Sequence, residues 1–374
     1  MVYLVTLLTI LTHGCYVGSR LVTSLFALEL GACPLEVGVL AGLYAFLSLL
    51  LAIQAGKVCD RLGPVRPMLF GALLGAAALG IASAFASINA LYVCAALSGA
   101  GFIFFNVSVQ SLVALMSTPA ERSRNFSILS QSYSVSTLGF PLLVGFTLQY
   151  FGAVTSYLVL AVLALVPALL LPTARPLASL RSAAAGAKPR SNVLELLRDR
   201  PLRSSFVSSG LVVTGWDLYT FYLPVYAHAI GIDAVTIGTL LALFGGAAFV
   251  VRYFLPPLAA RLTEAGLLAW AMLLAAALFV VFPLFHDVYA LGLLSLLLGL
   301  TLGLGQPLSM MITYNRAPAA RAGEANGVRL MVNHFTHFAV PIVSGALGTA
   351  FGVGPVFWLN AGCLAAAAKV LRAR

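Results

Sequence analysis

The chain has 374 residues, of which 61% are hydrophobic and only 9% are charged, and its mean hydropathy is +1.02. A soluble domain carries roughly a quarter charged residues, so this composition excludes a water-soluble protein and indicates lipid as the main solvent. The formal net charge is +10, but the basic residues lie in short runs between apolar stretches, which favours contact with anionic membrane lipids over a nucleic-acid-binding face.

Apolar segments that are long enough to cross a bilayer follow one another along the chain. A transmembrane helix needs about 20 apolar residues. Glycines, prolines and charged clusters separate twelve such segments: 2–30, 35–55, 67–87, 90–116, 126–150, 153–172, 204–230, 234–259, 266–286, 288–315, 327–350 and 353–371. We therefore expect an all-α membrane protein with 12 transmembrane helices.

The 21 Lys and Arg residues are distributed unevenly among the predicted loops. They lie in the loops on one side of the membrane, and we group Arg329, at the start of the eleventh segment, and Lys369, at the end of the twelfth, with this charged side. Only Arg20 and Arg252 then remain inside apolar segments. By the positive-inside rule the charged side is cytoplasmic, as are both ends of the chain, in the cytoplasmic (inner) membrane of a bacterium.

One connection is much longer than the others. Residues 173–203 are rich in Ala, Pro and Arg, and Asn192 begins a short amphipathic helix that ends at Asp199. We interpret this segment as a cytoplasmic linker at the membrane interface. It divides the chain into an N-terminal six-helix half, residues 1–172, and a C-terminal six-helix half, residues 204–374.

The two halves are internal repeats with an offset of 200 residues. The matches fall at equivalent places in successive helices, so chance coincidence among common residues is a weak explanation. The matched pairs include Gly38 and Gly238, Arg61 and Arg261, Gly99 and Gly299, Pro141 and Pro341, and Gly145 and Gly345. Because each half has an even number of helices, the repeats are parallel, which suits alternating access to a site near the membrane midplane.

The loop between the second and third segments carries the motif Gly56-x-x-x-Asp60-Arg61-x-Gly63, followed by Arg66. It resembles the signature loop of the major facilitator superfamily, and the twelve segments and central linker extend the resemblance over the whole chain. The resemblance implies that this loop is a conformational latch. Asp60 would face the positive N-terminal end of the eleventh helix in the outward-open state, and Arg61 and Arg66 would make cytoplasmic charge contacts.

Some positions depart from the family pattern. The second-half copy of the loop keeps Arg261, but Ala260 and Thr263 replace its aspartate and its glycine. The drug antiporters of the family carry an arginine in the fourth helix where this chain has Ala95, and their fifth-helix glycine-proline motif is matched only in part. These departures weaken a proton/drug antiport interpretation without removing it.

Asp217 is the one acidic residue at mid-membrane depth in the predicted helices. A charge there costs roughly 2.5–3.5 kcal/mol on insertion scales, so an ionisable side chain in this place indicates function. We predict that Asp217 couples transport to protons; a structural ion pair or helix–helix hydrogen bond is the alternative. Arg20 is its expected partner, since the repeat aligns Arg20 with Thr220, one turn from Asp217. Arg20 could instead bind an anionic substrate, or extend its charged end to the outer membrane interface.

Three other ionisable residues at membrane depth have two interpretations each. His334 and His337 share a face of the eleventh helix and fit either a proton relay or neutral side chains hydrogen-bonded to the backbone. Arg252, near the cytoplasmic end of the eighth helix, fits either binding of a substrate carboxylate or a structural brace. We expect no metal site, because no carboxylate or cysteine neighbours the histidines and the five cysteines lack metal-binding spacing.

Polar side chains within the predicted helices indicate substrate contacts. Uncharged amides suit hydrogen bonds to a solute, although they also hold helices together. Besides Arg20 and Arg252, the predicted substrate-binding residues are His13, Tyr16, Asn106, Gln110, Gln131, Tyr219, Tyr222, Gln306 and Asn333.

The sequence indicates a transporter and not an enzyme, since it has neither a catalytic pattern nor a nucleotide-binding P-loop. We predict a proton-coupled secondary transporter of a small organic solute, with the proton gradient as energy source and no cofactor. We favour efflux by proton antiport; proton-coupled uptake of an organic anion is the alternative, and a non-transporting receptor or a lipid flippase is an alternative of another class. The expected partners are the solute, protons and membrane lipid, without nucleic acid, and the expected state is a monomer.

Overall fold

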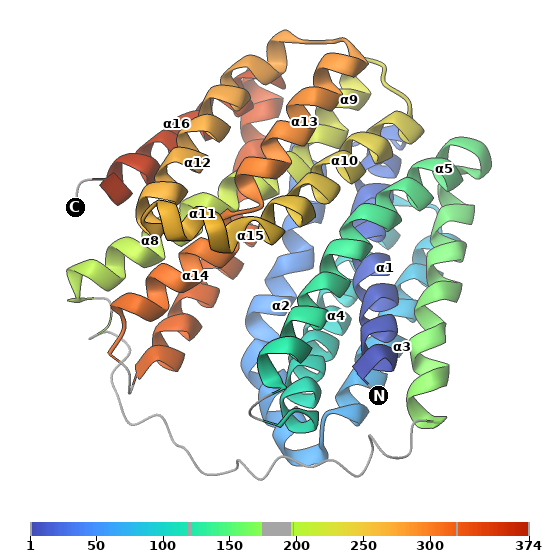
Figure 1. The fold of residues 1–374 in the computed structure, drawn as a ribbon. Helices are drawn as coiled ribbons and strands as arrows, with labels where there is room; N and C mark the ends of the chain where they lie inside the picture. Colours follow the sequence, from blue (N-terminus) through green and yellow to red (C-terminus); the bar gives the residue numbers. More distant parts are fainter. Residues whose placement is uncertain (1, 119–120, 174–195, 197, 319–320, 373–374) are drawn as a thin grey trace. The chain divides into compact units, whose positions relative to one another are not determined.

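The computed structural model describes residues 2–118, 121–173, 196, 198–318 and 321–372 (Figure 1). In this part of the chain all regular secondary structure is helical. The chain forms two compact units by its internal contacts. Unit 1 comprises Met1–Ala32, Leu43–Lys188 and Asp233–Ala242, and unit 2 comprises Cys33–Gly42, Pro189–Ile232 and Leu243–Arg374. Most of the amphipathic helix predicted from Asn192 to Asp199 lies outside the described residues.

Unit 1 consists of long helices that pack side by side. They are α1 (Val2–Glu29), the larger part of α2 (Pro34–Leu62), α3 (Val65–Ala84), α4 (Ile88–Met116), α5 (Arg122–Leu170), the short η1 (Leu171–Thr173) and the first half of α10 (Ala234–Tyr253). Helix α1 packs against α4 and α5, and α3 packs against the same two helices. Leu8, Met68 and Phe105 are among the fully buried side chains that fill the space between them.

Unit 2 contains more and shorter elements. They are the start of α2, α8 (Arg200–Asp217), the π-helix η2 (Leu218–Tyr222), α9 (Leu223–Ala229), the rest of α10, α11 (Leu255–Arg261), α12 (Glu264–Val281), η3 (Phe282–Leu284), α13 (Val288–Leu302), α14 (Gly305–Arg316), α15 (Ala322–Phe351) and α16 (Gly354–Arg372). Helix α8 packs against α14, α15 and α16, and α12 packs against α13, α14 and α16.

The helices confirm the predicted membrane fold. Among the described residues, 10 helices are long and apolar enough to cross a bilayer. One of them, Arg124–Leu170, has 47 residues, about twice the length of one crossing, and is interrupted by non-helical backbone at Gly152. It therefore accounts for two predicted segments. The remaining predicted segment, 204–230, is divided by η2 into α8, whose 18 residues include three charged ones, and α9, which has only 7 residues.

The 200-residue repeat has a counterpart in the geometry of each unit. Gly31 and Gly231 both have positive φ, 86° and 82°, at equivalent turns where a side chain would be strained. In unit 1 a Cβ on Gly99 would overlap the backbone carbonyl of Tyr44. In unit 2 a Cβ on Gly299, 200 residues later, would overlap the carbonyl of the equivalent Phe244. The same close approach of two helices is thus built twice.

Candidate functional site

Asp217 is the last residue of α8, and none of its surface is exposed. The backbone changes its hydrogen-bonding pattern directly after it, because Leu218–Tyr222 form a single π-helical turn. Such turns within longer helices occur frequently at functional sites. The π-helical turn therefore indicates a functional site at the same position as the buried carboxylate of Asp217.

His337 of α15 is the partner of Asp217. Its Nδ1 lies 2.6 Å from Oδ2 of Asp217, a hydrogen bond that becomes an ion pair when the imidazole is protonated. The helices approach closely at Gly210, where a Cβ would lie 2.9 Å from Cγ1 of Val332. The sequence predicted both Asp217 and His337 as proton-coupling residues but did not pair them. The expected pair of Asp217 with Arg20 would join the two units and stays a prediction.

The other carboxylate oxygen of Asp217, Oδ1, is buried and has no hydrogen-bond partner in the part of the chain that the structure describes. An unpaired buried acceptor costs about 1–3 kcal/mol, so the fold leaves this oxygen unsatisfied at a cost in stability. His334 lies on the same helix as His337, with ring centroids 6.1 Å apart. One carboxylate and two imidazoles thus lie near one another in unit 2, while their predicted role in proton coupling stays a prediction.

Arg329 lies inside α15 and not in the loop before it, while the side of the membrane on which it lies stays a prediction. Only 4% of its surface is exposed, because the helix begins at Ala322 and carries Arg329 into contact with α14. Its Nε donates to Oδ1 of Asn326 at 3.1 Å. Its Nη1 donates to Oε1 of Gln306 at 3.1 Å and to Oγ of Ser309 at 3.3 Å. A buried cation therefore rests on neutral oxygens.

Gln306 and Asn333, two of the predicted substrate-binding residues, belong to the same polar group. Nδ2 of Asn333 donates to Oε1 of Gln306 at 3.3 Å, and Oδ1 of Asn333 accepts from Oγ of Ser209 at 2.8 Å. Arg329, Asn333 and His337 follow one another at a spacing of four residues and so share one face of α15. That spacing is the sequence signal that would have revealed Arg329.

Arg252 lies in α10 and braces a break between two helices. Its Nε donates to the carbonyl of Gly303 at 3.2 Å, at the point where α13 ends and α14 has not yet begun. Its Cζ lies 5.9 Å from the ring centroid of Trp216, within the range of a cation–π interaction. These contacts fit the structural alternative for Arg252, while its predicted role in substrate binding stays a prediction.

The polar residues predicted in unit 1 form a cluster between α1, α4 and α5. Nδ1 of His13 lies 2.5 Å from Oγ of Ser136, and the His13 ring meets Tyr133 edge-on at 4.9 Å between centroids. The Tyr133 hydroxyl donates to Oδ1 of Asn106 at 2.6 Å, and Gln110 donates to the same oxygen at 3.4 Å. The sequence analysis missed Tyr133 and Ser136, which link His13 to the amides.

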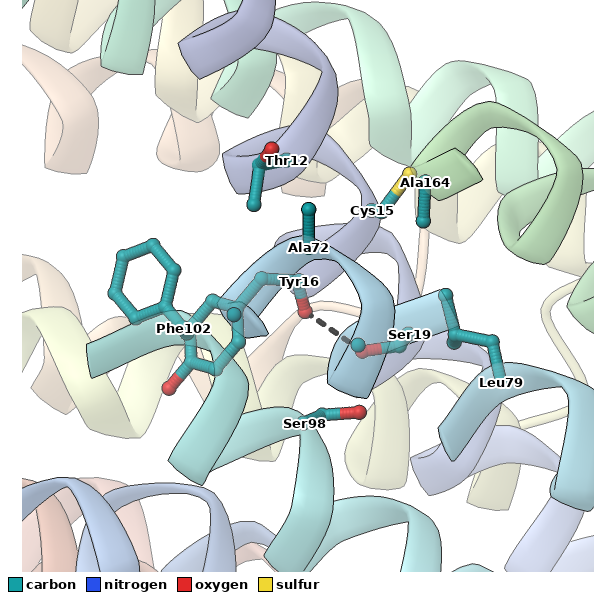
Figure 2. A pocket seen from close by; sticks show the side chains of 11 residues that line it. Thr12, Cys15, Tyr16, Ser19, Ala72, Leu79, Ser98, Phe102 and Ala164 are labelled. Atoms are coloured by element: carbon teal, nitrogen blue, oxygen red, sulfur yellow. Dashed lines mark hydrogen bonds between the residues drawn. The ribbon is translucent and has the colours of Figure 1, made fainter. Parts of the chain in front are cut away.

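Tyr16 and Phe102 stack at 4.2 Å between ring centroids, beside a small cavity in unit 1. Figure 2 shows side chains from α1, α3, α4 and α5 around this cavity, among them Thr12 and Ser98. The Thr12 hydroxyl is buried without a hydrogen-bond partner in the described chain. The cavity volume of about 20 Å³ suffices for about one water molecule, not for an organic solute.

The remaining predicted residues are placed as follows. Arg20 is half-buried in α1, and Gln131 is exposed on α5. Tyr219 and Tyr222 of η2 are fully buried, and Tyr219 stacks on Phe244 at 4.2 Å between centroids. Substrate binding by these residues stays a prediction.

The signature loop turns at Gly63, whose φ of 76° suits only glycine. Asp60, Arg61 and Arg66 are exposed around this turn, and a Cβ on Gly56 would meet open space. The turn follows directly from the motif. The latch contacts that the motif implies would reach the second half of the chain and stay a prediction.

Long apolar helices in two repeated sets define a polytopic membrane protein, and the family that its sequence matches consists of transporters and not enzymes. Residues 3–341 match the Major Facilitator Superfamily, and this chain belongs to that family. The resemblance of the signature loop is thereby confirmed.

Curated relatives match the chain over part of their length. The multidrug resistance protein MdtH of Cronobacter sakazakii is 33% identical over 138 residues, which are 37% of this chain and 34% of that protein. MdtH of Yersinia pestis is 29% identical over 206 residues, which are 54% of this chain and 49% of that protein. The chain thus spans between a third and a half of the length of these relatives.

Solved structures share the fold at low sequence identity. The nucleoside transporter NupG has a TM-score of 0.82 and 14% identity, covering 100% of this chain and 98% of that chain. The peptide transporter POT in complex with sulfate has a TM-score of 0.83 and 17% identity, covering 100% and 93%. A bacterial homologue of the lysosomal transporter Spinster, in an inward-facing and occupied conformation, has a TM-score of 0.76 and 13% identity, covering 99% and 94%.

Proposed function

We propose that this transporter exports small organic solutes from the cytoplasm in exchange for protons, by alternating access. The observation that carries the proposal is the buried pair of Asp217 and His337, in which Oδ1 of the carboxylate has no partner among the described residues. The names of the MdtH relatives, which describe multidrug resistance proteins, support export. The substrates are small molecules, and no cofactor takes part.

The proton acts by changing the charge of the pair. With Asp217 ionised, its carboxylate attracts the imidazole of His337 and holds α8 against α15. A proton on Oδ1 neutralises the carboxylate and weakens that attraction, so the two protonation states favour different arrangements of the helices. When the contact between Asp217 and His337 is broken, Arg20 of the first half is the second partner for Asp217.

The location follows from the same reasoning. The loops with basic residues face the cytoplasm, and both ends of the chain lie on that side of the inner membrane. Protons enter from outside, where their concentration is higher, and the solute leaves in the opposite direction. The transporter acts as a monomer, since each chain contains both repeats that alternating access requires.

Purified protein in liposomes tests the proposal. An imposed pH gradient should drive movement of tetraphenylphosphonium, a lipophilic cation, and Asp217→Asn should abolish this movement. Asp287→Asn is the matched control, because Asp287 is exposed and only caps α13 through the amide of Ala290. If Asp217→Asn transports as well as the wild type does under the gradient, proton coupling at this residue is wrong.

Proton-coupled uptake of an organic anion is the second candidate. Arg20, half-buried in α1 within the electrostatic reach of His13, is the observation that favours it. The same liposomes distinguish the two directions: accumulation of benzoate with the proton gradient, lost in Arg20→Ala, would favour uptake over export.

A further inference from the structure

Arg329 carries a buried positive charge that is not used by the proton-coupling pair. Its hydrogen bonds go to Asn326, Gln306 and Ser309, which are all neutral. The acidic side chains of unit 2 that the structure describes have other partners: Glu36 the amide of Cys33, Asp199 the amide of Leu202, Asp217 the ring of His337, Glu264 the amide of Asn315, and Asp287 the amide of Ala290. A buried charge without a counter-charge is costly, so a ligand that supplies one would bind favourably.

The side chains around Arg329 present more N–H donors than acceptors. A guanidinium only donates, so Gln306 must turn its Oε1 toward Arg329, and this oxygen also accepts from Asn333. The amide nitrogen of Gln306 is thereby turned away. Within the described chain, Nε2 of Gln306 and Nη2 of Arg329 donate no hydrogen bond. The group therefore lacks acceptors, which an anion would provide.

The group is buried within unit 2 and does not lie on the exposed apolar face of α15. Ser209 and Ser309, which hydrogen-bond each other at 3.1 Å, are buried beside it. On the same helix Leu330, Met331 and Phe335 are exposed by 42%, 53% and 59% and form an apolar face. An anion at Arg329 would therefore bind among buried polar side chains and not on this apolar face, which favours a soluble molecule over a lipid headgroup.

We propose that Arg329, Gln306 and Asn333 bind the oxyanion of a small ligand, a carboxylate or a phosphate group. Nη2 of Arg329 and Nε2 of Gln306 donate to the anion's oxygens, and the guanidinium supplies the opposite charge. Asn333 fixes Gln306 in the orientation that exposes its amide nitrogen. The site depends neither on the direction of transport nor on proton coupling at Asp217.

Thermal stability of the full chain in nanodiscs of zwitterionic phosphatidylcholine tests the site. Inorganic phosphate and acetate are titrated against chloride at constant ionic strength and low millimolar concentration, where general salt effects on stability are small. We expect a saturable rise in the melting temperature of the wild type. Arg329→Gln should weaken the apparent Kd about 30-fold or more, and Arg329→Lys should weaken it less, because lysine keeps the charge but loses the fork.

Two control variants and one lipid complete the design. Arg203→Gln removes an exposed arginine of the same unit and should leave the anion effect unchanged, as should Asp217→Asn. Asp217→Asn would abolish the proposed proton coupling, so an unchanged anion effect in this variant shows that the two proposals are independent. Phosphatidylglycerol in the nanodiscs distinguishes a lipid from a soluble source of the anion. If this lipid stabilises the protein and the effect requires Arg329, the oxyanion site is supported and the lipid headgroup is its ligand.

The proposal is overturned if neither phosphate, acetate nor phosphatidylglycerol gives a saturable shift, or if Arg329→Gln responds as the wild type does. Should Arg329→Gln fail to fold, the comparison with Arg329→Lys decides the question. An unchanged apparent Kd in the lysine variant would then overturn the site, because a lysine cannot make the forked hydrogen bonds by which the guanidinium would hold the anion.

Discussion

Nδ1 of His337 and Oδ2 of Asp217 are 2.6 Å apart, and this contact joins α15 to the end of α8 immediately before the π-helical turn. The carboxylate is completely buried, whereas the imidazole is 31% exposed. In the proposed coupling, the histidine is therefore the side from which a proton would reach the pair. The same contact also holds α8 against α15.

Replacing His337 by Ala should destabilise the protein, because it leaves Asp217 buried without its hydrogen bond. The loss of a hydrogen bond to a charged group is worth about 2 kcal/mol. Unfolding in detergent, followed by the melting temperature, measures it. The double variant Asp217→Asn/His337→Ala should recover part of the loss, since the amide is neutral. Equal melting temperatures for the single and double variants would contradict a charge-dependent contact.

Replacing Gly99 or Gly299 by Ala should lower the melting temperature. A Cβ at either place would overlap a backbone carbonyl of the neighbouring helix, that of Tyr44 or Phe244. The helices would have to move apart, at a cost of about 1–3 kcal/mol. Gly80→Ala is the control: a Cβ there meets nothing within 4 Å, and alanine favours a helix. A stability of Gly99→Ala equal to that of Gly80→Ala would speak against close packing.

Arg252→Ala should reduce thermal stability without changing the ligand affinity of the folded protein. The side chain hydrogen-bonds the carbonyl of Gly303 at the break between α13 and α14, so its removal frees a helix end. Thermal unfolding and equilibrium binding of tetraphenylphosphonium and benzoate, measured on the same preparation, separate the two effects. A weaker benzoate affinity at unchanged stability would instead assign Arg252 to substrate binding.

Asp233 should make stability depend on acid. It precedes α10, outside the apolar span; partial burial raises its pKa, but hydrogen bonds from the amide and hydroxyl of Thr236 lower it more, so the pKa lies below its ordinary value of 3.8. A depressed pKa means that the carboxylate stabilises the fold above its unfolded pKa and that this contribution is lost as pH falls through the folded pKa.

The variant Asp233→Ala should therefore melt at a lower temperature than the wild type at neutral pH, by the amount that an N-terminal cap contributes. The difference should shrink only below about pH 4, where the wild-type carboxylate also takes up its proton. A difference that is constant down to pH 3 would show that the cap is not electrostatic.

Much of the fold could be predicted because the bilayer constrains it strongly. A span needs a minimum length of apolar residues, and every backbone polar group inside it must be satisfied within a helix, so hydropathy alone located the helices. The boundary between α5's two segments at Gly152 was placed correctly by the repeat and by its glycine. The π-helical turn after Asp217 could not be predicted, since nothing in Leu218–Tyr222 distinguishes its spacing from that of an α-helix.

The candidate site could likewise be predicted only in part. That Asp217, His337, Gln306 and Asn333 matter follows from the cost of polar groups in an apolar segment, which is a property of each residue alone. Which of them meet was decided by the tertiary structure: the approach of α8 to α15 at Gly210 pairs Asp217 with His337, and the start of α15 at Ala322 buries Arg329 beside Gln306. Hydropathy records how much a residue costs in lipid, whereas partners depend on how helices rotate and cross. For that reason the membrane fold and its repeat could be deduced from the sequence alone. The contact between Asp217 and His337 and the burial of Arg329 could not.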